Sequence, residues 1–359
     1  PGGQFAHLFI FQAGGWGNDE LLRSLEANQP SSLHPPAIYD TLNEVDIIST
    51  ERRAFKLMAN TGEEHLTGTR LLQVGLIGNP VAHSYSPRFQ QAAFDALNIP
   101  ARYELWHTLP DELPARVATL LAPQCMGANI TIPYKEAVLP LMDVVDPLAT
   151  RIRAVNTIVH RNEYLYGYNT DAYGLLHALV EQGIGKYIDQ DTITLWDYTA
   201  VLLGAGGAAR SAAFALVNAS IKQLIIVNRN LERAQRLAAE LQQDGECPVF
   251  CLSEPDFLMP HSASLIINAT PVGMHSAGEQ EGSEGISPLP PEVLARFAPD
   301  TFVFDMVYNP TETQLLCQAR ILGLRAVNGL TMLLHQGALA FTLWTGQPAP
   351  LEIMRATLL

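Results

Sequence analysis

A glycine-rich turn lies between a short apolar run at residues 201–203 and a stretch of small residues that favours a helix. Gly204, Gly206 and Ala209 follow the run at the spacing G-x-G-x-x-G/A. In a strand-turn-helix context, the first glycine allows a tight turn, the second admits a pyrophosphate, and the third small residue allows close helix packing. The helix N-terminus adds N–H donors and a positive dipole end. The segment predicts a dinucleotide site that also includes Ala205, Gly207 and Ala208.

The residues after the next apolar run indicate which dinucleotide this site takes. In sites for NAD, an Asp or Glu here binds the two ribose hydroxyls and repels a 2′-phosphate. This chain has Asn228, Arg229 and Asn230 instead, with Arg233 one helical turn further along. A guanidinium can stack on adenine and pair with a 2′-phosphate, and the second arginine adds positive charge on the same face. We therefore expect NADP; the alternative is that both arginines are ordinary surface residues.

A second group of polar residues lies in the first half of the chain, in segments 78–87, 127–136, 154–157 and 169–171. Two hydroxyls precede a helix that we expect to begin at Pro87, and hydroxyls in such a turn can bind an anion. The second segment places Asn, Thr and Lys at the end of an expected strand, where sites in open sheets gather. Each segment alone also has an interpretation as ordinary turn or cap chemistry.

The elements that must position these groups follow an alternating pattern. From about Leu72, short apolar runs alternate with helix-like segments, which predicts right-handed βαβ units and parallel sheets in an α/β fold. Several runs are almost continuously apolar, as in strands covered on both faces. We expect strands at 74–77, 128–132, 157–160, 199–203, 224–227, 265–268 and 302–305.

Composition and charge exclude several other classes of protein. The net charge of −14 and the lack of a Lys and Arg stripe argue against nucleic acid as a partner. No apolar stretch reaches the roughly 18 to 20 residues that a membrane span needs. The four cysteines lack paired metal-ligand spacing and no His-Glu-x-x-His motif occurs, so we expect no metal and reduced thiols in a cytoplasmic protein. Because the chain begins with Pro1, we expect a processed product or a fragment.

Taken together and in this order, these segments resemble the shikimate dehydrogenase family from about Leu72 to the C-terminus. Further matching motifs are at 268–274, 305–310 and 328–336. The resemblance implies two α/β domains, a substrate-binding domain and a Rossmann-like NADP-binding domain, with an open cleft between them. We expect the first over 71–171, completed by C-terminal helices at 329–359, and the second over 172–328. Residues 1–70 are an extension of unknown role with possible helices at 19–28 and 42–60, and residues 275–291 read as an exposed acidic loop.

The resemblance also assigns residues to the substrate shikimate. In the family, two serines and a tyrosine hold the carboxylate, and these correspond to Ser84, Ser86 and Tyr308. The ring hydroxyls are assigned to Thr131, Asn156, Lys135 and Asp171, with Gln336 closing the site. Additional cofactor contacts are assigned to Thr270, Met306 and Gly329.

The chemistry implied is the reversible reduction of 3-dehydroshikimate by NADPH. Hydride delivered to a ketone carbon creates an alkoxide, so a cation or proton donor must lie at that oxygen. Lys135 is the candidate, and Asp171 would orient its ammonium and share a hydroxyl.

Two further enzymes and one protein of another class remain as alternatives. A quinate/shikimate dehydrogenase shares nearly all of these groups, and an aminoshikimate-type dehydrogenase changes few contacts. A non-catalytic sensor of shikimate-pathway metabolites would use the same body, but the presence of both Lys135 and Asp171 argues against it. We expect only small-molecule partners and a monomer or homodimer.

Overall fold

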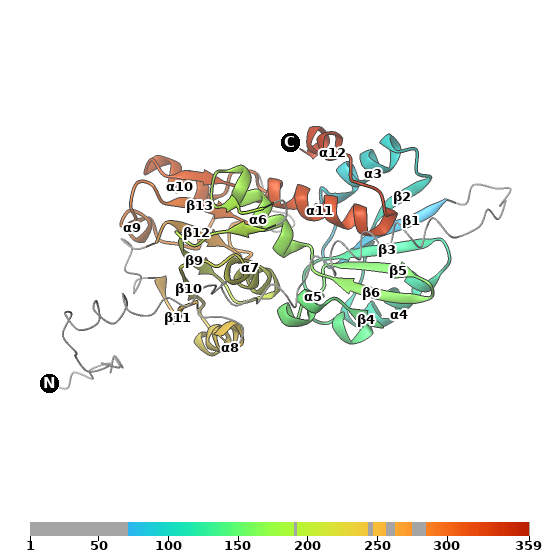
Figure 1. The fold of residues 1–359 in the computed structure, drawn as a ribbon, viewed down its shortest axis with the longest axis horizontal. Coiled ribbons are helices and arrows are strands. Elements are labelled where there is room, and N and C mark those ends of the chain that lie inside the picture. Colours follow the sequence, from blue (N-terminus) through green and yellow to red (C-terminus); the bar gives the residue numbers. More distant parts are fainter. Residues whose placement is uncertain (1–70, 190–191, 243–246, 256–262, 275–284, 359) are drawn as a thin grey trace, which may run out of the picture. The chain divides into compact units, whose positions relative to one another are not determined.

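The computed structural model describes residues 71–189, 192–242, 247–255, 263–274 and 285–358. These residues belong to one compact unit that contains two six-stranded sheets and their covering helices (Figure 1). The expected extension over 1–70, with its two helices, and the acidic loop up to residue 284 lie outside the described residues.

The first sheet is built from the segment that carries the first group of polar residues. Its strand order is β2-β1-β3-β5-β6-β4, parallel between β2, β1 and β3 but antiparallel from β3 to β5 and from β5 to β6. A two-residue turn with positive φ at Asn162 and Glu163 joins β5 to β6, as tight hairpins require. Its strands are β1 (Leu72–Gly78), β2 (Ala101–His107), β3 (Cys125–Ile130), β4 (Val144–Val145), β5 (Thr157–Arg161) and β6 (Tyr164–Tyr168).

The second sheet is parallel throughout, with the order β11-β10-β9-β12-β13-β14. This is the doubly wound order in which the chain reverses direction beside the first strand, and ligands bind at that edge. Its strands are β9 (Thr199–Leu203), β10 (Gln223–Val227), β11 (Val249–Leu252), β12 (Leu265–Asn268), β13 (Phe302–Asp305) and β14 (Arg325–Val327); a separate pair is β7 (Lys186–Tyr187) and β8 (Ile193–Thr194).

Strand β9 shows why the second sheet is so apolar in sequence. Successive side chains of a strand point to opposite faces. Ala200 and Leu202 lie in the apolar core on one face, whereas Val201 and Leu203 lie in the core on the other. Both faces are therefore covered, and every residue of the strand is buried.

The helices cover these faces with apolar sides. In α8, residues Ala234, Leu237, Ala238 and Leu241 recur at helical spacing and are buried. The helices are α3 (Ser86–Ala96), α4 (Leu113–Ala118), α5 (Pro147–Ile152), α6 (Asp171–Glu181), α7 (Gly207–Asn218), α8 (Leu231–Gln242), α9 (Pro291–Leu294), α10 (Gln314–Ile321), α11 (Leu330–Thr345) and α12 (Leu351–Leu358), with 3₁₀ turns η1 (Pro110–Glu112), η2 (Thr119–Leu121) and η3 (Leu139–Leu141).

The last two helices return to the first sheet. Helix α11 packs against α6 and α3, and α12 packs against α3 (Figure 1). Phe341 of α11 lies in the same apolar core as Phe89 and Phe94 of α3, with ring centroids of Phe94 and Phe341 5.0 Å apart. Residues from the two ends of the described chain thus form one core.

The α/β fold class expected from the sequence is confirmed, with two differences in detail. The seven expected strands are present, but β3 ends at Ile130 rather than Ile132. Pro133, three residues after the end of β3, has no N–H to continue a ladder. The first sheet is mixed rather than parallel, because β5 and β6 form a hairpin. In the described residues, no helix has the length and apolar character to cross a membrane.

Candidate active site

Lys135 and Asp171 form an ion pair at the edge of the first sheet. Lys135 follows β3 and Asp171 is the first residue of α6. The ammonium nitrogen lies 2.5 Å from Oδ2 of Asp171, and the two side chains are only 17% and 7% exposed. Charges removed from water in this way must be held by further hydrogen bonds. The second carboxylate oxygen therefore needs a partner of its own.

Asn156 holds that oxygen and joins the pair to two other elements. Its amide nitrogen donates to Asp171 Oδ1 at 2.8 Å and to Thr170 Oγ1 at 2.9 Å, and it lies 3.3 Å from Oε1 of Gln336. The side-chain carbonyl oxygen of Asn156, Oδ1, accepts from the backbone N–H of Thr170 at 2.7 Å. Residues at the starts of β5 and α6 and within α11 are thereby fixed together beside Lys135.

The predicted anion-binding residues form a second group. Ser86 donates its backbone N–H to Ser84 Oγ at 3.2 Å, and the rings of Tyr85 and Tyr308 lie 5.5 Å apart. Burial raises the pKa of Tyr308, and a hydrogen bond with the Ser84 side chain partly offsets the rise. Ser84 and Tyr308 are therefore neighbours although they are distant in sequence.

A hydrogen-bond chain links the two groups, and sequence reasoning assigned no role to its central members. Tyr103 OH donates to Asn129 Oδ1 at 2.8 Å, and Asn129 Nδ2 donates to Thr157 Oγ1 at 3.1 Å. Thr157 in turn donates to Asn156 Oδ1 at 3.2 Å. Burial raises the pKa of Tyr103 well above its usual value, and a hydrogen bond with Ser86 opposes the rise. Asn129 and Thr157 stood in segments that the sequence marked as polar, whereas Tyr103 did not.

Thr131 lies directly after β3. Its backbone N–H donates to the carbonyl of Ile77 at 2.9 Å. A Cβ atom placed on Gly78 would lie 2.3 Å from the Thr131 methyl group, so the glycine leaves the space that the threonine occupies. The threonine is half-buried, and its methyl group lies against Gly78, the first residue of the segment that carries the serines.

The glycine turn connects β9 to α7 as expected. Gly204 has φ of +111°, a conformation in which a side chain would be strained. Gly206 precedes α7, and Gly207 is its first residue. A Cβ atom on Gly207 would lie 3.6 Å from Cβ of Lys135. The turn, including buried Ala205 and half-buried Ala208, therefore lies next to the Lys135–Asp171 pair.

The residues of this turn fit a bound pyrophosphate. A Cβ atom on Gly206 would meet no other described atom closer than Nη2 of Arg233 at 4.0 Å. Packing within the chain therefore does not account for a glycine at this position. Close approach of phosphate oxygens to the backbone amides at the start of α7 does account for it.

The predicted 2′-phosphate residues lie at the end of β10. Asn228 donates its side-chain amide to the carbonyl of Asn230 at 2.8 Å, and Asn230 Oδ1 accepts from the backbone N–H of Arg233 at 2.9 Å. Both hydrogen bonds shape the start of α8. Arg229 is exposed, whereas Arg233 pairs with Glu136 at 3.0 Å. Both arginines thus lie at the same edge. Among the ion pairs of the described residues, Arg233 has a carboxylate partner and Arg229 has none.

Three further predicted cofactor residues lie on loops after β12, β13 and β14. A network around the buried Asp305 shapes these loops: its Oδ1 accepts from Asn268 Nδ2 at 2.9 Å, and Asn268 Oδ1 accepts from Thr270 Oγ1 at 2.7 Å. Burial raises the pKa of Asp305, and hydrogen bonds from Thr313, the Val307 N–H and Asn268 oppose the rise. A Cβ atom on Gly329 would lie 2.3 Å from the carbonyl oxygen of Met306. Thr270, Met306 and Gly329 therefore face the same end of the second sheet as the glycine turn.

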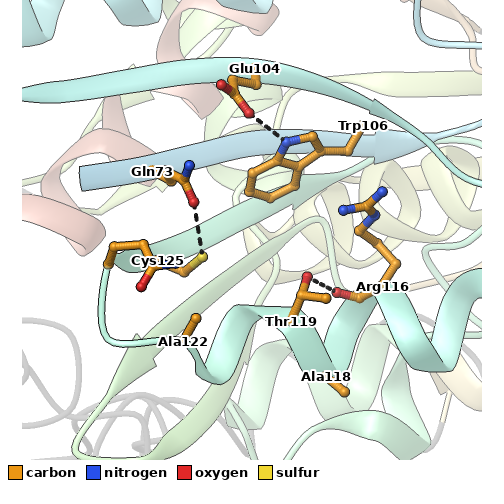
Figure 2. A pocket seen from close by; sticks show the side chains of 9 residues that line it. Gln73, Glu104, Trp106, Arg116, Ala118, Thr119, Ala122 and Cys125 are labelled. Carbon is orange, nitrogen blue, oxygen red and sulfur yellow. Dashed lines mark hydrogen bonds between the residues drawn. The ribbon is translucent and has the colours of Figure 1, made fainter. Parts of the chain in front are cut away.

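A separate cavity of about 460 Å³ lies between residues of β1, β2 and β3 and the segment 116–124 (Figure 2). Trp106 Nε1 donates to Glu104 Oε2 at 3.0 Å across one wall, and Cys125 lies against Gln73 at 3.8 Å. None of the catalytic, substrate-binding or cofactor-binding residues predicted from the sequence lines this cavity. In the described part of the chain, no cluster of His, Cys, Asp or Glu could hold a metal ion.

Comparison with known families matches three parts of the chain. The model described as shikimate dehydrogenase substrate binding domain matches residues 76–158. The model for shikimate / quinate 5-dehydrogenase matches residues 188–270, and that for the shikimate 5′-dehydrogenase C-terminal domain matches residues 329–359. The three matches fall on the first sheet, the second sheet and the returning helices.

Individual proteins resemble the chain over most of its length. Shikimate dehydrogenase (NADP(+)) from Moorella thermoacetica is 44% identical over 287 residues, which are 78% of this chain and 90% of that protein. The structure of shikimate 5-dehydrogenase from Thermus thermophilus in complex with NADP(H) and shikimate is 37% identical, with a TM-score of 0.68 over 80% of this chain and 98% of that one. A 5-ketofructose reductase from Gluconobacter sp. is 28% identical, with a TM-score of 0.67 over 81% of this chain and 99% of that one. The resemblance inferred from the sequence is confirmed: the chain belongs to the shikimate dehydrogenase family.

Proposed function

We propose that this protein catalyses the reversible NADPH-dependent reduction of 3-dehydroshikimate to shikimate, a step in aromatic amino-acid biosynthesis. The observation that carries the proposal is the Lys135–Asp171 ion pair, 2.5 Å long, beside the glycine turn of the second sheet. A fixed ammonium next to a dinucleotide site is what the reduction of a ketone needs.

Lys135 and Asp171 are the catalytic residues in this proposal. When bound, NADPH supplies the hydride. Lys135 places its ammonium at the ketone oxygen, stabilises the negative charge that develops there and passes a proton to it. Asp171 holds that ammonium through Oδ2, and Asn156 keeps the carboxylate in one orientation through Oδ1.

Substrate recognition divides between the two polar groups. Ser84, Ser86 and Tyr308 bind the carboxylate of the substrate. Hydroxyl donors suit this role because they bind an anion without adding a positive charge that would compete with Lys135. The amide and hydroxyl groups of Thr131, Asn156 and Gln336 bind the ring hydroxyls.

The cofactor is NADP(H), held along the edge of the second sheet. The backbone of the glycine turn binds the pyrophosphate, and the Arg229 and Arg233 side chains bind the 2′-phosphate. The remaining contacts come from Asn228 and Asn230 at the adenosine end, and from Thr270, Met306 and Gly329 at the nicotinamide end.

A quinate/shikimate dehydrogenase and an aminoshikimate-type dehydrogenase remain the second candidates, because both substrates keep the carboxylate and most of the ring hydroxyls. The experiment that separates them measures kcat/KM for shikimate and quinate, each with NADP⁺ and NAD⁺. We expect the highest value for shikimate with NADP⁺. A higher value for quinate would replace the proposal with the second enzyme. Binding of shikimate with no hydride transfer under any condition would favour the metabolite sensor.

We further propose two domains, 71–171 with 329–359 and 172–328, separated by an open cleft.

All four cysteines are free thiols in the structure, which suits a protein of the reducing cytoplasm. We expect a monomer or homodimer; sedimentation of the purified chain decides between them.

A further inference from the structure

An ion pair joins the two sheets beside the candidate active site. Nη2 of Arg233, at the start of α8, lies 3.0 Å from Oε1 of Glu136, the residue after Lys135. The side chains are 47% and 51% exposed. An exposed pair of this kind contributes little to stability. The pair matters for cofactor binding, because Arg233 is one of the two arginines assigned to the 2′-phosphate.

The pair lies across the glycine turn. A Cβ atom on Gly206 would lie 4.0 Å from Nη2 of Arg233, and one on Gly207 would lie 3.9 Å from Oε1 of Glu136. The Glu136 carboxylate is therefore a negative charge at the place where the phosphates of a dinucleotide approach α7. This carboxylate forms an ion pair with Arg233, and its negative charge repels phosphates that approach α7.

A second charged contact between the two halves, Arg153 with Glu240 at 3.2 Å, lies near the far end of α8, next to a buried contact of Arg210. Arg210 of α7 donates from Nε to the carbonyl of Ile152 at 2.5 Å and pairs with Glu240 at 2.6 Å, and Ile152 itself lies in the apolar core of α7. The Arg210 side chain is only 10% exposed. This contact is part of the packed interior, whereas the pair between Glu136 and Arg233 can separate without exposing apolar surface.

We propose that Glu136 is a specificity-determining residue that competes with the 2′-phosphate of NADP for Arg233. The inference rests on the proposed function, in which Arg233 binds that phosphate. Arg233 has two partners that exclude one another: Glu136 before the cofactor binds, and the 2′-phosphate afterwards. Transfer of Arg233 to the phosphate releases Glu136 and removes the charged contact between the sheets at this edge. NAD has no 2′-phosphate, so it leaves the ion pair intact.

The experiment measures dissociation constants for NADP⁺ and NAD⁺ by titration calorimetry at low ionic strength. The variants are Glu136→Gln, Arg233→Ala and the double variant. We expect Glu136→Gln to tighten NADP⁺ by roughly three- to fivefold, the size expected for release of an exposed ion pair, and to tighten NAD⁺ less. In the Arg233→Ala background the same change should affect both cofactors equally. High salt should reduce the effect, because screening weakens exposed charges.

A matched control is Glu232→Gln, which removes one negative charge next to Arg233 in sequence but from a pair with Arg236 at 2.9 Å. We expect a smaller change there. If Glu232→Gln tightened NADP⁺ as much as Glu136→Gln, or if the Glu136 effect persisted without Arg233, competition would be wrong and general electrostatics would explain the data. If Arg233→Ala weakened NADP⁺ but Glu136→Gln changed nothing, only this inference would fail. If Arg233→Ala left NADP⁺ binding unchanged, the cofactor assignment under the proposed function would fail instead.

Discussion

The two oxygens of the Asp171 carboxylate have different partners: Oδ2 lies 2.5 Å from the ammonium of Lys135, and Oδ1 accepts from the Asn156 amide at 2.8 Å. The second hydrogen bond fixes the plane of the carboxylate before any substrate arrives. The ammonium is then held from one side, and its remaining N–H donors stay available for a ketone oxygen. Such preorganisation costs no rearrangement during the reaction.

Replacement of Lys135 by alanine should remove most of the catalytic effect while the substrate still binds. We expect kcat for shikimate oxidation to fall by about 10²- to 10⁴-fold, as for loss of a group that transfers a proton. The KM for shikimate should change comparatively little, because the carboxylate and other hydroxyl contacts remain. Steady-state kinetics check this, with calorimetric shikimate binding as the control for folding. An unchanged kcat would remove Lys135 from the mechanism.

Replacement of Ser84 by alanine should act mainly on binding. A hydrogen bond to a charged group contributes about 1.5–3 kcal/mol, so we expect KM for shikimate to rise roughly tenfold or more. The kcat should fall less, since the reacting carbon is remote from the carboxylate. Ser287→Ala is the matched control, because that hydroxyl donates to the carbonyl of Leu289 at 2.7 Å in the loop before α9. Equal KM values for the two variants would contradict the anion-binding role.

Removal of the Arg229 charge should separate the two cofactors. Arg229→Ala is expected to weaken NADPH by roughly tenfold or more, because a charge-assisted contact to the 2′-phosphate is lost. NADH lacks that phosphate and should be affected far less. Dissociation constants from fluorescence titration give the comparison, with Arg296→Ala as an exposed arginine outside the predicted site. Equal losses for both cofactors would refute the assignment.

Two histidines make the stability of the fold depend on pH. Burial and, less strongly, the nearby His335 lower the pKa of His177 from 6.5 to about 4, and Glu181 opposes the shift. Burial also lowers the pKa of His335, which contacts Glu181 at 2.8 Å. Between pH 6.5 and about 4 the unfolded chain therefore binds more protons than the folded one, and the free energy of unfolding must fall as the pH is lowered through this range.

The measurement is the urea midpoint of unfolding at pH 7.5, 6 and 5. We expect His177→Gln to flatten the decrease, since glutamine cannot be protonated. His107→Gln, which changes an exposed histidine, should follow the unmodified protein. A midpoint independent of pH from 7.5 to 5 would be inconsistent with a buried neutral His177.

The four central strands of the second sheet and the glycine turn could be predicted from the sequence because their signals are local, whereas the edge strands β11 and β14 were not predicted. Strands such as β9 are buried on both faces, so all residues of β9 after Thr199 are apolar, and Gly204 with its positive φ marks the turn directly. Strands β2 and β6 were not predicted. In β2 the buried and exposed positions alternate, so its apolar residues form no continuous run. The hairpin between β5 and β6 has the uncommon turn pair Asn162 and Glu163, which lacks the glycine that usually marks such turns.

The individual groups of the site could be predicted, but their connections could not. Lys135 and Asn156 lie near the ends of strands that the sequence predicts, whereas Asp171 follows β6, which was not predicted, and was noted only as part of the polar segment 169–171. The chain from Tyr103 through Asn129 depends on which strands are neighbours and in what register, and no local pattern reports this. The contact of Glu136 with Arg233, residues 97 positions apart, depends on how two sheets face one another.

The return of α11 and α12 to the first sheet has a consequence for the order of events on the ribosome. Phe89 and Phe94 obtain their cover from residues such as Phe341, which are synthesised only after the whole second sheet. The nucleotide-binding half can therefore fold while translation continues, whereas the half that holds Lys135 must wait with apolar side chains uncovered. A nascent chain that stalls before Leu330 would have its pyrophosphate turn but an incomplete shikimate pocket, and it would present a surface that chaperones recognise.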